Sequence, residues 1–479
     1  MPLAVHHRCL LGLAAMVTLW AVETADGEVV RFEVKKRETF ANGQSFGTVG
    51  PYERIIGTVH YAIHPDNPRN RPIVDLQYAP RNAAGLVAFE ADLFILAPKN
   101  LAKANGAALY DVNNRGNKLA IRFFNDGPGG NDPQDGGNGY LMREGYTIIW
   151  SGWDGELLPG GNRLQLHAPV ARDHEKTITG PVRYEISVDK PSTREPINRA
   201  NHGAYRPTAA GLAAATLTWR LRPRDKRVRI PREQFQLRVV EVKDAPHGQL
   251  PDVQLDLPAG FRPGYLYEVI YEAQDPLVHG TCFASVRDLI AAVKHGDGKG
   301  NPLLRGGNPV IHRAHGFGVS QSGRFLRELL YSGFNADTKG RIVFDGLMPH
   351  VAGGGLGSFN HRFAQPTAYA TQHQLWDWPT DRFPFAYETQ RDPVSKRQDG
   401  ILRTATDLLT APKVMHTQTA TEYWSRSGSL VHTDPLGRHD ARPPDNVRKA
   451  EGFQVSYEFF GIAIASLRTS CRQTRQLNR

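Results

Sequence analysis

The stretch Gly318-Val319-Ser320-Gln321-Ser322-Gly323-Arg324 decides the fold, because it joins a strand-like segment to a helical one. Residues 309–319 form an apolar run that predicts a strand, and residues 323–331 carry apolar side chains at helical spacing. Small residues before and after Ser320 permit a tight turn between the two elements. A turn of this kind exposes the serine hydroxyl and directs the first amide groups of the helix toward it.

Working outward from this turn, strand-like and helical segments alternate along the chain. Apolar residues at helical spacing predict a helix over 282–295. Apolar runs predict strands at 91–96, 107–112, 145–150, 265–271, 341–344 and 412–418. Such alternation is typical of an α/β fold with a doubly wound, mostly parallel sheet.

The rest of the chain predicts how this sheet is extended and interrupted. Residues 26–90 carry strand-like stretches between Gly and Pro turns, which predicts a β-rich N-terminal lead-in. Residues 172–257 are polar and Pro-rich without a long helical pattern, which predicts an insertion or cap. We expect the core in two parts, over 91–171 and 258–448, followed by an atypical tail over 449–479.

The N-terminus has the pattern of a signal peptide. His6, His7 and Arg8 give it a weakly basic start, and residues 9–22 supply an apolar segment of suitable length. We therefore expect residues 1–25 to be removed and the protein to be exported, as a periplasmic or secreted protein. No later segment is long and apolar enough to span a bilayer, so no membrane association is expected after cleavage.

Charge and composition narrow the possible partners. The net charge of +10 is dispersed, with basic residues among acidic ones as in 222–227, and no basic stripe is interleaved with aromatics. We therefore expect no nucleic-acid partner. The three cysteines form no CxxC pair of the kind that binds zinc. His312 and His315 face opposite sides of a predicted strand, so they cannot easily share a metal ion. The glycine run 353–357 lacks the fingerprint of a dinucleotide-binding site. These patterns predict no metal and no organic cofactor, and residues 353–357 are expected to form a flexible loop.

Two segments resemble the signature that surrounds a nucleophilic serine. The literal Gly-x-Ser-x-Gly occurs at residues 43–47, but no apolar strand precedes it and Gly50-Pro51 follows where a helix should begin, so we interpret Ser45 as a turn residue. Ser320 has the expected strand and helix on either side. Choosing Ser322 instead would place Arg324 at a crowded position of the turn. Ser320 is therefore the predicted nucleophile, and an ordinary Ser-rich turn is the alternative.

Several motifs resemble one known family. The stretch from Gly318 to Arg327, together with 113–116, 151–153, 344–346 and 421–424, resembles a family of exported bacterial α/β-hydrolase-domain proteins over about 32–448. More distantly, the turn at Ser320 is similar to those of glucuronoyl esterases and of tannase- and feruloyl-type esterases. The resemblance implies an α/β-hydrolase fold and an ester substrate that is a small molecule or is derived from plants.

A serine nucleophile needs a histidine to take its proton and a carboxylate to orient that histidine. Glu422 follows the predicted strand at 412–418, where the resemblance also places an acid, and is the predicted carboxylate. A surface glutamate at a strand end is the alternative interpretation. Asp345 is a competitor one strand earlier, interpreted as shaping the loop after that strand.

The remaining site residues follow from position along the chain. The amide of Gln321 and donors from Asn114 and Arg115, in the turn after an earlier strand, are expected to form an oxyanion hole. Trp153 is predicted to line the substrate pocket, although packing is the commoner role of a large aromatic side chain.

The histidine of the triad does not fit the pattern. Only His432 and His439 lie downstream of Glu422, and both precede residues 443–448, which resemble the lead-in to the family's last strand. The resemblance places the histidine after that point, yet none occurs through Arg479. Three explanations stay open. In the first, the reading frame has shifted or been cut near Arg448. In the second, His432 or His439 has taken over the role of the general base. In the third, the protein is a non-catalytic exported ligand- or carbohydrate-binding protein on a degenerate hydrolase scaffold.

The leading hypothesis is a carboxylic ester hydrolase that forms an acyl-enzyme on Ser320, with a peptidase or amidase as the alternative enzyme.

Overall fold

The computed structural model describes residues 28–243, 246, 248–367 and 382–452. The predicted signal peptide, residues 1–25, and most of the predicted atypical tail, from residue 453 onward, lie outside these described residues. Within the described part, no helix combines the length and apolar character needed to cross a bilayer.

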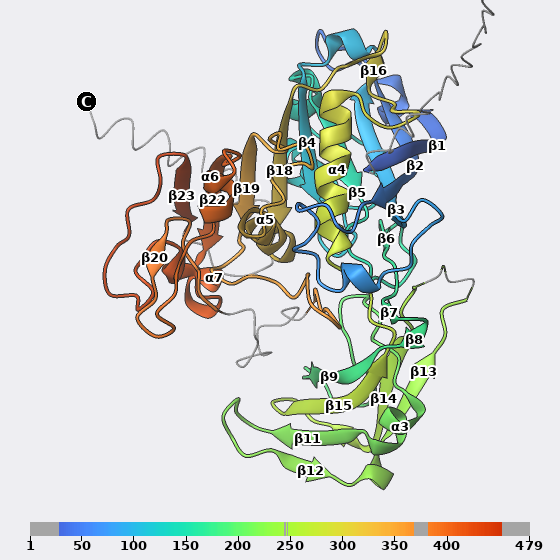
Figure 1. Ribbon diagram of the computed structural model, residues 1–479, viewed down its shortest axis with the longest axis vertical. Helices are drawn as coiled ribbons and strands as arrows, with labels where there is room; N and C mark the ends of the chain where they lie inside the picture. The colour runs from blue at the N-terminus through green and yellow to red at the C-terminus, as the bar shows by residue number, and fades with distance from the viewer. Residues whose placement is uncertain (1–27, 244–245, 247, 368–381, 453–479) are drawn as a thin grey trace, which may run out of the picture.

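One large sheet forms the centre of the molecule (Figure 1). Its order is β1-β2-β3-β5-β4-β18-β19-β22-β23, and β6 pairs with β3 at its side. The strands are β1 (Val29–Thr39), β2 (Tyr52–Ile63), β3 (Val87–Pro98), β4 (Ala107–Val112), β5 (Thr147–Ser151), β6 (Leu166–His167), β18 (Arg313–Val319), β19 (Gly346–His350), β22 (Lys413–Thr419) and β23 (Val447–Gly452).

The two halves of this sheet differ in direction. The strands β1, β2 and β3 run antiparallel to one another and β3 runs antiparallel to β5, whereas β5, β4, β18, β19, β22 and β23 are all parallel. The sequence-based prediction of an α/β fold with a mostly parallel sheet and a β-rich N-terminal lead-in is therefore confirmed. The lead-in forms the antiparallel edge of the same sheet.

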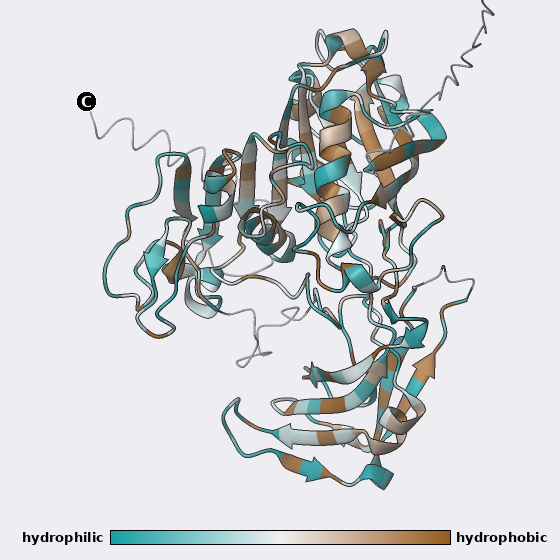
Figure 2. Ribbon diagram, viewed as in Figure 1, coloured by the Kyte–Doolittle hydropathy of each residue, from teal (hydrophilic) through white to brown (hydrophobic). Residues whose placement is uncertain are grey.

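Helices cover both faces of the sheet, as a doubly wound parallel sheet requires. The helices are α1 (Ala120–Asn125), α2 (Tyr140–Arg143), α3 (Ala209–Ala214), α4 (Thr281–His295), α5 (Gln321–Tyr331), α6 (Arg403–Asp407) and α7 (Ala420–Ser425). Alternating strand residues separate the faces: Ala108 and Tyr110 pack with α4 and α5, whereas Leu109 packs with α1 and α2. Figure 2 shows that hydrophobic residues concentrate in these central strands.

An insertion forms a separate lobe, drawn in green in Figure 1 below α5 and α7. Its strands are β7 (Arg172–Asp173), β8 (Lys176–Thr177), β9 (Thr179–Ile186), β10 (Ser192–Pro196), β11 (Thr216–Arg220), β12 (Val228–Ile230), β13 (Gln236–Val240), β14 (Asp252–Phe261) and β15 (Leu266–Gln274). They form one sheet of order β10-β14-β13, another of order β12-β11-β15-β9, and the small β7-β8 pair.

The insertion is longer than the sequence predicted. Residues 265–271 were expected to return to the central sheet, but β15 pairs with β9 and β11 inside the insertion. The insertion therefore ends near Gln274 rather than at 257, and the core resumes with α4. The error arose because an apolar run predicts a buried strand without indicating which sheet buries it.

Short elements complete the described chain. They are the strands β16 (Leu304–Arg305), β17 (Asn308–Pro309), β20 (Gln390–Arg391) and β21 (Gln398–Asp399), and the 3-10 helices η1 (Ala41–Gly43), η2 (Leu76–Tyr78), η3 (Leu101–Lys103), η4 (Arg232–Gln234) and η5 (Gly428–Val431). Ser45 lies exposed in the turn after η1, away from any strand-to-helix junction.

One predicted strand of the core is displaced. The strand expected at 341–344 is β19, which begins at Gly346 and runs beside β18 from His315 to Val319. Asp345 therefore precedes its strand, whereas the sequence interpretation placed it in the loop that follows. This shift changes which edge of the sheet Asp345 occupies.

Candidate active site

Ser320 lies at a sharp corner between β18 and α5. Its backbone has φ 56° and ψ −109°, a conformation that a residue with a side chain adopts only under constraint. Its N–H donates to the carbonyl of His350 on the neighbouring strand at 2.8 Å, which fixes the corner against the sheet. The residue is partly exposed, whereas the residues on either side are buried.

The glycines around Ser320 are needed because the backbone is crowded there. A Cβ atom on Gly318 would lie 2.4 Å from the carbonyl oxygen of Ser322. A Cβ atom on Gly323 would lie 3.0 Å from the carbonyl oxygens of both Gly318 and His350. Strand and helix thus approach more closely than side chains allow, and this approach sets the position of Ser320.

Ser322 has a structural role in the same turn. Its hydroxyl is buried, donates to the Val319 carbonyl at 3.0 Å and accepts from the Val319 N–H at 3.1 Å. A hydroxyl held in this way closes the turn and is not presented to a substrate. The geometry is therefore consistent with Ser320 as the reactive serine, which stays a prediction.

The predicted oxyanion donors differ in their availability. Gln321 is the first residue of α5, so its N–H cannot bond within the helix. Its side-chain amide donates to the Pro366 carbonyl at 2.9 Å and ties the loop after β19 over the corner. The amide of Gln321 therefore remains the predicted donor.

Asn114 does not fit its predicted role as a backbone donor. Its N–H donates to the Asn117 carbonyl at 2.9 Å, and its side-chain amide donates to the Val319 carbonyl at 2.6 Å. Both groups are used to hold the turn after β4 against the corner at Ser320, so Asn114 is a supporting residue. Arg115 lies beside it with φ 50°, and its guanidinium contacts Asn114 Oδ1 at 3.0 Å and Thr367 Oγ1 at 3.3 Å.

Glu422 lies at the same edge of the sheet as Ser320. It occupies the first turn of α7, directly after β22, and because β18 and β22 are parallel their carboxyl ends meet at one edge. Glu422 is buried and accepts from the Thr419 hydroxyl. Burial raises the pKa of Glu422, and the Thr419 hydrogen bond and the charge of Arg324, on the first turn of α5, partly oppose that rise.

Asp345 is excluded as the competing acid. It precedes β19 and therefore lies at the amino edge of the parallel strands, opposite the edge that carries Ser320. Its Oδ2 accepts from the Ala314 N–H at 2.8 Å and contacts Lys294 Nζ at 3.0 Å. Asp345 thus joins β18, β19 and α4 at the far side of the sheet.

The two candidate histidines occupy different environments. The ring of His432 stacks on Tyr423, the neighbour of Glu422, with ring centroids 5.6 Å apart. His439 lies exposed in a turn, where its carbonyl accepts from the Asp434 N–H at 2.8 Å. The structure therefore brings His432, and not His439, next to the helix that carries Glu422.

His350 is a neighbour of Ser320 that the sequence analysis missed. Its carbonyl accepts from the Ser320 N–H, and its Nδ1 lies 2.6 Å from the Thr417 hydroxyl. The ring packs between Phe123 and Phe317, and burial lowers the pKa of His350 to about 4, so the imidazole is neutral at pH 7. Correct placement of β19 would have revealed this residue at the carboxyl end of its strand.

Trp153, which the sequence predicted to line the substrate pocket, is buried within the core. It has no exposed surface and packs against Phe325 and Phe359, with ring centroids 4.7 Å and 5.5 Å away. Its indole N–H donates to the Asn113 carbonyl at 2.7 Å. The rings of Trp153 therefore pack in the hydrophobic core, and its indole nitrogen holds the turn after β4.

The glycine-rich loop after β19 is rigidly held, whereas the sequence predicted a flexible loop. Residues 353–357 are buried, and the Gly354 N–H donates to the Arg426 carbonyl at 2.8 Å. From α5, Arg327 donates to the Gly354 carbonyl at 2.9 Å, and Glu328 accepts from the Gly357 N–H at 2.9 Å. The loop therefore connects α5 to the end of α7, which joins the elements that carry Ser320 and Glu422.

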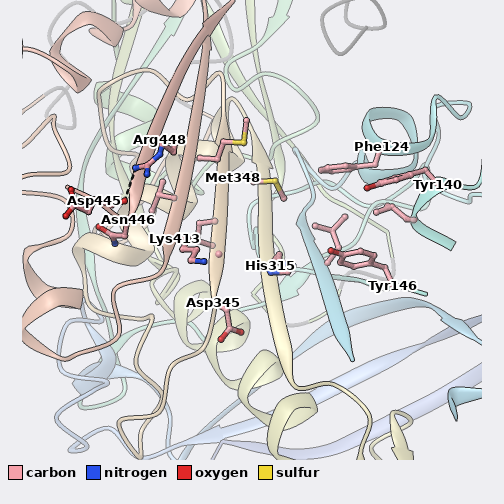
Figure 3. Close-up of a pocket in the computed structure, with 16 residues that line it drawn as sticks. Phe124, Tyr140, Tyr146, His315, Asp345, Met348, Lys413, Asp445, Asn446 and Arg448 are labelled. Carbon is pink, nitrogen blue, oxygen red and sulfur yellow. Dashed lines mark hydrogen bonds between the residues drawn. The ribbon is translucent and has the colours of Figure 1, made fainter. Parts of the chain in front are cut away.

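A cavity of about 870 Å³ lies elsewhere, on the face of the sheet next to α2. Figure 3 shows Phe124 and Tyr146 on one side of it and Lys413 and Arg448 on the other, with Met348 between them. Its lining includes Asp345 but none of the predicted site residues. The cavity is therefore separate from the corner at Ser320.

Comparisons with known proteins agree with the fold. Residues 253–455, which include Ser320 and Glu422, match a family model described as "Alpha/beta hydrolase domain". No curated protein matches the sequence. A solved structure titled "Glucuronoyl Esterase from Solibacter usitatus" has 11% identity and a TM-score of 0.30, covering 91% of this chain and 87% of that chain. A second structure with that title has 10% identity, a TM-score of 0.30, and coverage of 91% and 85%. At these values the likeness to the two solved structures carries no argument, and the agreement with the fold rests on the family model alone.

Proposed function

Because the chain has the α/β-hydrolase fold, with a matched hydrolase domain over residues 253–455, we propose that it is a serine hydrolase that cleaves carboxylic esters. The observation that carries the proposal is the constrained backbone of Ser320 at the corner between β18 and α5. A serine held there presents its hydroxyl at the carboxyl edge of the sheet, next to the opening amides of a helix.

The reaction proceeds through an acyl-enzyme. The Ser320 hydroxyl attacks the ester carbonyl and gives its proton to a histidine, and the tetrahedral oxyanion forms next to the Gln321 N–H. The histidine then protonates the departing alcohol, and water hydrolyses the acyl-enzyme by the same route in reverse. Glu422 holds the histidine in the required tautomer and stabilises its protonated form.

Of the two candidate bases, we propose His432. Its ring lies against Tyr423, beside Glu422, whereas His439 projects into solvent. If His432 is the base, His432→Ala reduces hydrolysis to the residual rate of a triad that lacks one member, about 10³- to 10⁴-fold over water. Wild-type hydrolysis in that variant would remove His432 from the mechanism.

The substrate and location extend the same proposal. The resemblance of the corner at Ser320 to those of plant-polymer esterases favours a plant-derived ester, which the protein would meet after export. The proposed substrate rests on the sequence resemblance, and the proposed export rests on the predicted signal peptide.

Hydrolysis of a short-chain p-nitrophenyl ester tests the proposal, with two serine variants compared. Ser320→Ala should abolish turnover, by up to about 10⁶-fold for a lost nucleophile. Ser45→Ala is the matched control, because Ser45 lies in the literal Gly-x-Ser-x-Gly but in an exposed turn, and it should leave the rate unchanged. Equal rates in wild type and Ser320→Ala would refute the proposal, and an inactive wild type would favour a ligand-binding protein.

A further inference from the structure

A fully buried group of ionisable side chains lies where the insertion meets the core. Asp154 comes from the loop after β5, His202 from the insertion between β10 and α3, and His279 from the residues just before α4. Their exposed fractions are 0%, 2% and 1%. The triad proposed above uses none of them.

The hydrogen bonds of His202 fix the position of its ring. Its Nε2 lies 2.8 Å from Asp154 Oδ2, and its Nδ1 lies 3.0 Å from the carbonyl oxygen of Ala200 and 3.2 Å from that of Arg199. Both ring nitrogens therefore face oxygen atoms, and the ring is held between Asp154 and the backbone of residues 199–200.

Asp154 accepts hydrogen bonds from several sides. Burial pushes the pKa of Asp154 upward, but the contacts with His202 and His279 outweigh burial and hold the pKa below its usual value. Asp154 Oδ1 also accepts from the Glu156 N–H at 3.0 Å. The carboxylate is thus ionised and buried against His202.

Other ionisable groups surround this pair. His279 Nε2 lies 3.2 Å from the Gly155 nitrogen and 3.5 Å from Asp154 Oδ1, and its Nδ1 lies 2.8 Å from the Phe359 carbonyl oxygen. Burial and the charge of Asp154 raise the pKa of Glu156 well above its usual value, and Glu156 accepts from the Tyr205 hydroxyl. Further titratable neighbours are Tyr184, Tyr271, Arg199 and Cys282.

The loop that carries Asp154 leads directly to the corner at Ser320. Next to Asp154, Trp153 donates to the Asn113 carbonyl at 2.7 Å, and Asn113 donates in return to the Ser151 carbonyl at 2.6 Å. The following residue, Asn114, donates to the Val319 carbonyl, which immediately precedes Ser320. In this chain of contacts, hydrogen bonds between buried or partly buried groups alternate with covalent links between neighbouring residues.

We propose that His202 is a positioning residue, whose buried ring holds Asp154 and the loop after β5 and, through that loop, the turn at 113–117 against the corner that carries Ser320. The insertion thereby supports the active site. The catalytic part of this inference rests on the proposed function, whereas the buried contact between His202 and Asp154 does not.

The buried contact of His202 is tested first, without reference to activity. His202→Gln should lower the melting temperature, because it leaves the buried Asp154 carboxylate without its partner. The matched control is His174→Gln, because His174 lies 2.8 Å from Asp173 in the same insertion but has a side chain that is 95% exposed, and it should leave the melting temperature unchanged. An unchanged melting temperature in His202→Gln would overturn the proposal.

Coupling between the two side chains is tested next. His202→Gln and Asp154→Asn each leave a buried group without its partner, so the loss of melting temperature in the double variant should be smaller than the sum of the two single losses. Simple addition of the two single effects would contradict a direct contact between the two side chains.

The positioning role has its own readout. His202→Gln should lower kcat by about tenfold to a hundredfold, the scale of a misplaced catalytic group, while KM changes little. An unchanged kcat would confine His202 to a structural role. If Ser320→Ala retains activity while the melting temperatures behave as expected, the proposed function fails and the buried contact between His202 and Asp154 stands.

Discussion

Gly318→Ala is the substitution that probes the corner at Ser320 most directly. The added Cβ would lie 2.4 Å from the Ser322 carbonyl oxygen and 3.0 Å from the Gly323 nitrogen, both in the backbone of the first turn of α5. Because backbone atoms cannot rotate away, β18 and α5 have to separate. Overpacking of this kind costs about 1 to 3 kcal/mol of folding free energy, and a shift of about 1 Å at the nucleophile costs up to about 10²-fold in rate.

Gly316→Ala is the control for this prediction, because it lies on the same strand. Its added Cβ would meet Leu347 Cδ2 at 2.6 Å, the far end of a flexible side chain that can turn aside. Melting temperature and kcat for p-nitrophenyl ester hydrolysis should therefore fall much further in Gly318→Ala than in Gly316→Ala. Equal effects of the two substitutions would refute the argument that a crowded backbone positions Ser320.

Three further substitutions separate structure from chemistry. Ser322→Ala removes two hydrogen bonds to Val319, so the melting temperature should fall by the equivalent of about 1 to 3 kcal/mol while ester hydrolysis continues. Asp345→Asn weakens the contact with Lys294 at the opposite edge, so it should also lower the melting temperature and leave kcat unchanged; a lost kcat would return Asp345 to the mechanism. Burial raises the pKa of Glu328 from 4.5 to about 8. The folded chain therefore retains a proton that the unfolded chain releases between these pH values, and stability falls as the pH rises through that window. Melting curves of Glu328→Gln should show a flatter decline, and an identical decline would contradict the assignment.

Much of the fold could be predicted because the buried strands are continuous apolar runs. The runs at 107–112 and 412–418 correspond to β4 and β22, and the helical spacing over 282–295 corresponds to α4. The strand β19 was displaced because Gly346–His350 contains Pro349 and a histidine, which weaken a strand signal, whereas the preceding Ile342, Val343 and Phe344 are apolar.

The candidate site was predictable only where chain order fixes position. The corner at Ser320 and the acid after β22 follow from the order of strands along the chain, and the structure places both at one edge of the sheet. The supporting role of Asn114 could not be predicted from sequence, because the partner of its side chain, the Val319 carbonyl, lies far away along the chain. The pairing of Asp154 with His202 was invisible for the same reason, since the two residues come from different lobes.

The central claim is that the hydroxyl of Ser320 is the reactive nucleophile, and covalent labelling tests it most directly. A fluorophosphonate probe is applied to the full-length protein, and the labelled tryptic peptide is sequenced by mass spectrometry. The expected product is the peptide 314–324 modified on Ser320, with Ser322 in the same peptide unmodified. Labelling of Ser322 or Ser45, or no labelling of the folded protein, would contradict the account.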